Sequence, residues 1–138
     1  MLATFAFDVC HDVYRAAREV IDTKIPTWNL ESTGKYTWHP DRMPRLAEYV
    51  CDFAGAGERA LGDPGRVRAS RMAMFRVYYL GGAEYQAARR HLGISELTWA
   101  DWSEEIRTRV GQELTRSGVF PPSKYFHEYS ISEPENAA

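Results

Sequence analysis

The feature that most constrains the fold is the stretch from Ala83 to Leu114, which predicts a short helix, a tight turn and a longer helix. After Trp99 its apolar residues recur every three or four positions, which places them on one face of a helix. The apolar set is Ala88, Leu92, Ile94, Trp99, Trp102, Ile106, Val110 and Leu114. Gly93 can take the left-handed geometry that ends the first helix, and Ser95 can cap the second. The stretch is therefore predicted to form a helix-turn-helix.

Apolar stripes predict three further helices, over residues 3–22, 42–57 and 67–80. The first has two adjacent stripes, so it should pack on more than one side. Gly55-Ala-Gly57 is expected to fray or stop the second helix, and Gly62-Asp-Pro-Gly65 is the strongest turn signal in the chain. The predicted fold class is all-α with about five helices, in which an N-terminal helical pair packs with a C-terminal helix-turn-helix unit.

The helices divide the chain into three regions. Residues 1–62 form an N-terminal helical region for packing or dimerisation, and residues 63–129 form the helix-turn-helix region with an aromatic tail. Residues 130–138 are small and acidic and are expected to be disordered. Trp28 and Trp38 lie in a loop without periodicity, which we expect to pin both rings onto the helices rather than present them to bases.

The charge distribution is uneven, although the net charge of the chain is only −2. From Arg66 to Arg116 nine arginines face six acidic residues, giving +3, and the remainder has eight basic and thirteen acidic residues, giving −5. A nearly neutral chain is not a polycation that coats nucleic acid without selectivity. The second half is the part that can accept an anionic partner.

The cysteine content and hydropathy indicate a cytoplasmic protein. Two cysteines, Cys10 and Cys51, are a poor disulfide framework for 138 residues and favour a reducing compartment. No apolar run approaches the length that spans a bilayer, and residues 1–10 lack the basic start of a signal peptide. We therefore expect no membrane partner.

Leu92-Gly-Ile-Ser95, followed by Thr98-Trp99, resembles the Leu-Gly-Ile-Ser-x-x-Thr-Val pattern of sigma-factor region 4 and related bacterial response-regulator domains. The resemblance covers roughly residues 67–114, about a third of the chain. The tail from Phe120 to Phe126 is similar to that of small phage- or mobile-element-associated proteins with such a domain. The resemblance implies a sequence-specific DNA-binding transcription regulator. Its implied partners are double-stranded DNA, a larger protein such as RNA polymerase, and a second copy in a homodimer.

The same resemblance implies two sets of DNA contacts, because this motif places its second helix in the major groove and holds phosphates with neighbouring side chains. The groove would be met by Ser95, Glu96, Ala100 and Asp101, with Arg107 further along. Phosphates would be held by Arg71, Arg76, Arg89 and Arg90. Trp99, Trp102 and Ile106 would belong to the core.

Two features depart from the family pattern. Arg89 stands four positions before the turn glycine, where the family usually has a small residue, so Ala87 and Ala88 would have to supply the close helix contact. The second helix is also acidic, with carboxylates at Glu96, Asp101, Glu104 and Glu105. Carboxylates repel the phosphates that flank the groove. The alternative interpretation is a protein-interaction adaptor whose helix-turn-helix binds another protein.

Catalytic and metal chemistry find little support in the sequence. Cys10, His11, His39 and Cys51 are residue types that bind zinc, but none has the spacing typical of zinc ligands. Two buried thiols explain the cysteines equally well. There is no phosphate-binding glycine loop with its lysine and no serine in a nucleophile-elbow pattern. We expect no enzyme activity, no cofactor and no metal.

Overall fold

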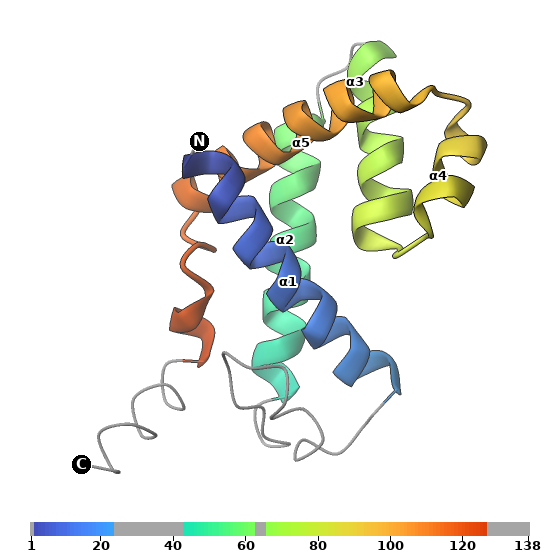
Figure 1. Cartoon of the computed structure of the whole chain (residues 1–138). Helices are drawn as coiled ribbons and strands as arrows, with labels where there is room; N and C mark the ends of the chain where they lie inside the picture. The colour runs from blue at the N-terminus through green and yellow to red at the C-terminus, as the bar shows by residue number, and fades with distance from the viewer. Residues whose placement is uncertain (1, 24–42, 63–65, 127–138) are drawn as a thin grey trace.

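The computed structural model describes residues 2–23, 43–62 and 66–126, and Figure 1 shows their arrangement. The described residues form five α-helices, namely α1 (Leu2–Thr23), α2 (Met43–Leu61), α3 (Arg66–Met74), α4 (Tyr85–Leu92) and α5 (Glu96–Arg116). Helix α3 continues directly into a π-helix, η3 (Phe75–Leu80), and a short 3-10 helix, η4 (Pro122–Phe126), follows α5. These residues contain no strand, so the predicted all-α fold is confirmed.

Helices α1, α2 and α5 form the body of the protein, with α5 lying across both of the others (Figure 1). The two apolar stripes of α1 supply Ala6, Phe7, Cys10, Val13, Tyr14, Ala17 and Val20, all of them buried. The predicted packing of α1 on more than one side, and of the N-terminal pair with the C-terminal unit, is confirmed. This face of the region predicted for packing or dimerisation is occupied by α2 and α5 of the same chain.

Two glycines permit the closest contacts of the core. A Cβ atom added at Gly111 of α5 would lie 1.9 Å from the carbonyl oxygen of Ala3, so only a glycine allows α1 and α5 to approach this closely. A Cβ atom at Gly57 of α2 would lie 2.1 Å from the ring of Phe75. The expectation that Gly55-Ala-Gly57 stops the helix was wrong. Helix α2 continues to Leu61, and the absence of a side chain at Gly57 makes room for the Phe75 ring.

Aromatic side chains join α1 to the π-helix that precedes the helix-turn-helix. The ring of Phe7 lies edge-on to Tyr79 with centroids 5.1 Å apart, and His11 stacks on Phe7 at 5.4 Å. Nε2 of His11 is 2.9 Å from the carbonyl oxygen of Tyr79. The hydroxyl of Tyr79 is in turn 2.7 Å from that of Ser103 on α5. These contacts fix the end of η3 relative to the body.

The segment after α5 returns to the body, where η4 contacts α2 and α1. Tyr125 is buried, lies edge-on to Tyr49 at a centroid distance of 5.0 Å, and donates a hydrogen bond to Oδ2 of Asp52 at 2.5 Å. Desolvation, followed by the bond to the Asp52 carboxylate, raises the pKa of the Tyr125 phenol well above its usual range. The expectations for Trp28, Trp38, the centre of the 62–65 turn and the 130–138 tail lie outside the described residues.

None of the helices within residues 2–23, 43–62 and 66–126 combines the length and the apolar content that crossing a bilayer requires.

Candidate nucleic-acid interface

The turn between α4 and α5 has the backbone geometry that the sequence predicted. Gly93 is left-handed, with φ 69° and ψ 37°, and its N–H donates to the carbonyl oxygens of Arg89 and Arg90. Ser95 is the N-cap of α5, where its Oγ accepts a hydrogen bond from the backbone N–H of Thr98 at 3.1 Å. The turn and the cap both provide hydrogen bonds to backbone groups that have no partner within the helix. They fix the direction in which α5 leaves the turn.

Trp99 holds the helix-turn-helix together. Its ring lies edge-on to Tyr78 of η3 at 4.8 Å and edge-on to Tyr85 of α4 at 5.0 Å, and only 8% of the residue is exposed. Ala88 is buried whereas Ala87 is exposed, so Ala88 is the small residue that allows close packing of α4. The prediction that Trp99 belongs to the core is confirmed, and α5 begins on a rigid support.

The first two turns of α5 present an exposed front, which we define as Ser95, Glu96, Leu97, Ala100 and Asp101. This end of α5 lies beside α3 and α4, whereas the other end packs on α1 (Figure 1). The structure therefore brings together four residues that the sequence proposed for the groove. It adds Leu97, which is 81% exposed and which sequence reasoning missed. Its position two residues before the buried Trp99, on the other side of the helix, was the available signal.

Three of the arginines proposed for DNA contacts, two for phosphates and Arg107 for the groove, are paired with carboxylates of the same chain. Arg71 donates through Nε to Oε1 of Glu105 at 2.8 Å, and its guanidinium lies 4.7 Å from the centre of the Trp102 ring. The remaining pairs are Arg76 with Glu58, at 3.0 and 2.7 Å, and Arg107 with Asp8, at 3.0 and 2.8 Å. Each of these arginines pairs with a different carboxylate, and together they do not surround the exposed front.

The two arginines of α4 differ in their surroundings. Arg89 donates to the carbonyl oxygen of Ile94 at 3.3 Å and to Oε1 of Gln86 at 2.8 Å, and it lies over the Tyr85 ring. It therefore supports the turn. Arg90 is exposed, and its side chain makes no hydrogen bond or ion pair with any residue in the described part of the chain. Of the five proposed arginines, Arg90 is the one best placed to meet an anion beside the front.

The front itself is acidic. Glu96 and Asp101 are exposed, and Glu104 follows on the same side of α5 one turn later, also exposed. Carboxylates in a major groove accept hydrogen bonds from the amino group of cytosine. On a protein surface they attract a basic partner, and Leu97 adds an apolar contact between them.

The described residues considered for a zinc site do not form a group of metal ligands. Cys10 is buried, and burial raises the pKa of its thiol to about 11. Cys51 is exposed, which corrects the expectation that both thiols are buried. His11 is engaged with Tyr79, and His39 lies outside the described residues. Residues 2–23, 43–62 and 66–126 contain no group of three or more His, Cys, Asp or Glu side chains that could hold a metal ion.

No protein-family model, curated protein or solved structure matches this chain. The candidate interface is thus defined by its own geometry: a left-handed turn, a capped helix start and an exposed front.

Proposed function

We propose that this protein is a cytoplasmic, sequence-specific DNA-binding transcription regulator of the small type found in phages and mobile elements. The observation that carries the proposal is the exposure of Ser95, Glu96, Ala100 and Asp101 at the start of a helix held by the Gly93 turn. A duplex needs this end of α5 to be free, because a recognition helix enters the major groove with its N-terminal residues foremost.

In the proposed complex the front supplies the base contacts. The carboxylates of Glu96 and Asp101 accept hydrogen bonds from base amino groups, the hydroxyl of Ser95 donates or accepts, and the methyl group of Ala100 contacts thymine. Arg90 contacts a phosphate beside the groove. Arg89 acts indirectly, since its bonds to Ile94 and Gln86 hold the turn that orients α5.

The exposed front alone offers too few contacts for high-affinity DNA binding. A single recognition module buries only about 600–1,000 Å² on DNA, and Arg71, Arg76 and Arg107 would have to leave their carboxylate partners to add phosphate contacts. We therefore propose that the chain acts as two copies on one DNA site or together with RNA polymerase.

A salt titration of duplex binding tests the proposal. Fluorescence anisotropy with random duplex DNA should give an affinity that falls steeply as salt rises, and Arg90→Ala should reduce the slope by about 1 for all sequences. Asp101→Asn should instead change the preferred sequence in a selection from a random library. Arg15→Ala is the matched control, because Arg15 is an exposed arginine on α1 paired with Asp12. Absence of duplex binding at low salt would contradict the proposal.

The second candidate is a protein-interaction adaptor, and the observation that favours it is Leu97. This side chain is 81% exposed and is flanked by the carboxylates of Glu96 and Asp101, an arrangement suited to a basic groove with an apolar floor. The adaptor predicts binding of purified RNA polymerase that is lost in Leu97→Asp and is independent of DNA. A matched Leu2→Asp variant, which changes an exposed leucine on α1, should leave that binding intact.

A further inference from the structure

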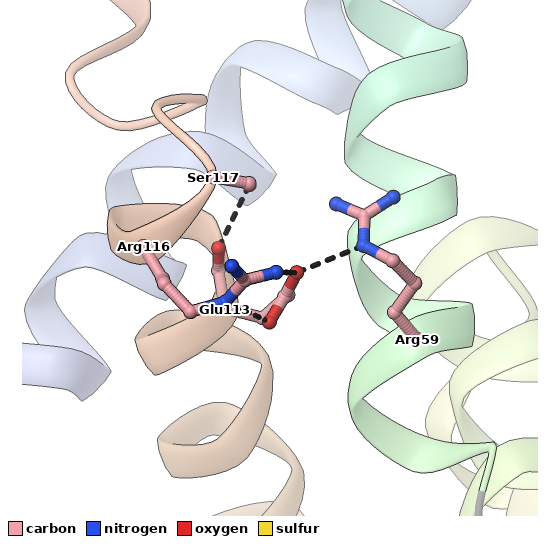
Figure 2. Close-up of polar contacts among 4 residues, drawn as sticks. All are labelled: Arg59, Glu113, Arg116 and Ser117. Atoms are coloured by element: carbon pink, nitrogen blue, oxygen red, sulfur yellow. Dashed lines mark hydrogen bonds and ion pairs between the residues drawn. The ribbon is translucent and has the colours of Figure 1, made fainter.

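A second polar surface lies between the C-terminal half of α2 and the second half of α5, apart from the exposed front. It is a hollow of about 390 Å³ lined by Arg59, Ala60, Arg109, Gln112, Glu113 and Arg116. Figure 2 shows how the side chains of Arg59 and Arg116 converge on Glu113 from the two helices. None of these residues takes part in the interface described above.

Glu113 organises the hollow. Arg59 donates through Nε to Oε2 of Glu113 at 2.8 Å, and Arg116 donates through Nε and Nη2 at 3.0 and 2.6 Å. The hydrogen bonds from Arg116, together with the one from Arg59 and against the opposing effect of burial, lower the pKa of the Glu113 carboxyl to about 2. The carboxylate stays ionised at physiological pH and holds both guanidiniums in place.

The hollow has an excess of positive charge. Three guanidiniums and one carboxylate give a local charge of +2. Two of the three cations stand at the rim, since the side chains of Arg59 and Arg116 are 52% and 70% exposed, whereas that of Glu113 is 13% exposed. Arg59 uses only Nε for Glu113, and Figure 2 shows its two terminal nitrogens directed away from that carboxylate. These nitrogens are donors available to a further oxyanion.

We propose that this hollow binds an oxyanion of the phosphate class, either a small phosphate compound or a phosphodiester of nucleic acid. Guanidinium groups match the geometry of phosphate oxygens, and fixed, charge-assisted hydrogen bonds are stronger than neutral ones. Gln112 adds an amide that can donate to a remaining oxygen. Glu113 acts as a positioning residue behind the two arginines at the rim.

The hollow is a separate site from the front of α5. Arg109 and Arg116 follow Glu96 by 13 and 20 residues, which corresponds to about 20 and 30 Å along the helix. The major groove is only about 12 Å wide. The groove contacted by the front would therefore not reach the hollow. Phosphate binding at the hollow does not depend on the proposed function.

Isothermal titration with inorganic phosphate and with pyrophosphate, at constant ionic strength against chloride, tests the site. We expect saturable binding that weakens at least tenfold in the double variant Arg59→Gln, Arg116→Gln. Arg15→Gln is the control and should bind as the unmodified chain does. Glu113→Gln keeps a side-chain oxygen that can accept hydrogen bonds from the two arginines and raises the local charge to +3, so it should tighten binding several-fold, which a purely structural ion pair would not predict. Circular dichroism spectra of each variant establish that the fold is kept.

Parallel titrations with a DNA duplex identify the source of the phosphate. If the double variant loses phosphate binding and also lowers the salt slope of duplex binding by about 2, the ligand is a nucleic-acid backbone. If phosphate binding is lost and the slope is unchanged, the ligand is a small phosphate compound. Both results support the site. The proposal is overturned if neither phosphate, pyrophosphate nor duplex binds saturably, or if the double variant binds all three as the unmodified chain does.

Discussion

The guanidinium of Arg107 on α5 forms a two-point ion pair with the carboxylate of Asp8 on α1, with Nε–Oδ1 at 3.0 Å and Nη2–Oδ2 at 2.8 Å. The two residues are 99 positions apart, so this pair ties the two longest helices together. The side chains are 30% and 54% exposed, and an ion pair in such a setting contributes at most about 1 kcal/mol. Its main effect is to direct Arg107 towards α1 and away from the exposed front.

Breaking this pair should cost little stability. We expect Asp8→Asn and Arg107→Gln each to lower the free energy of unfolding by about 1 kcal/mol or less, with a coupling of similar size in a double-mutant cycle. Urea denaturation of the two single variants and the double variant gives the coupling. Arg107→Gln should leave the salt slope of DNA binding unchanged. A slope reduced by about 1 would instead assign Arg107 to a phosphate.

The helix crossing at Gly111 should tolerate no side chain. In Gly111→Ala the new Cβ would lie 1.9 Å from the backbone oxygen of Ala3, and backbone cannot move aside as a flexible side chain can. We expect a loss of about 3 kcal/mol or more, at the upper end of overpacking effects. Gly55→Ala is the matched control on α2, where the nearest atom is Nη1 of Arg59 at 3.4 Å. That variant should be neutral or up to about 1 kcal/mol more stable, because alanine favours helix. Equal unfolding midpoints for the two variants would contradict the tight crossing.

His11 should make stability depend on pH. Burial lowers the pKa of its imidazole, against the opposing hydrogen bond to Tyr79, and the charge of Arg15 lowers it further. The unfolded chain takes up the proton at about pH 6.5. Below that pH the unfolded state binds more protons than the folded state, so the free energy of unfolding falls as pH falls and is fully restored above about pH 6.5.

Denaturation at a series of pH values checks this expectation. The fall in stability below about pH 6.5 should be smaller in His11→Gln, which removes the buried imidazole. It should be retained in His91→Gln, because His91 is exposed on α4. If the two variants show the same dependence on pH, the buried histidine is not its cause.

The start of α5 should depend on its cap and turn. Ser95→Ala removes the bond to the N–H of Thr98 and should cost about 1 kcal/mol, whereas Ser95→Gly should cost only a few tenths. Gly93→Ala forces a side chain into the left-handed region at φ 69° and should cost about 1–2 kcal/mol. Chemical denaturation measures these changes. If Ser95→Ala and Ser95→Gly have equal effects, the cap does not support the helix.

Features that depend only on neighbouring residues could be predicted from the sequence. Gly93 and Ser95 were identified as turn and cap because left-handed backbone and N-capping involve groups within a few positions of one another. The two stripes of α1 predicted burial on more than one side because helical periodicity is a local property. The helix end at Gly93 and the helix start after Ser95 agree with the structure, whereas the glycines of Gly55-Ala-Gly57 did not end α2.

Which residues pair across the chain depends on how the helices pack. The carboxylates that neutralise Arg71 and Arg107 lie 34 and 99 positions away, so no local pattern could predict these pairs. Gly57 became a contact for Phe75, although a glycine pair in a sequence commonly signals the end of a helix. The arginines around Glu113 likewise come from two helices that only the packed core brings together. Local geometry shaped each helix, but the free charges and the exposed surfaces follow from how the helices pack.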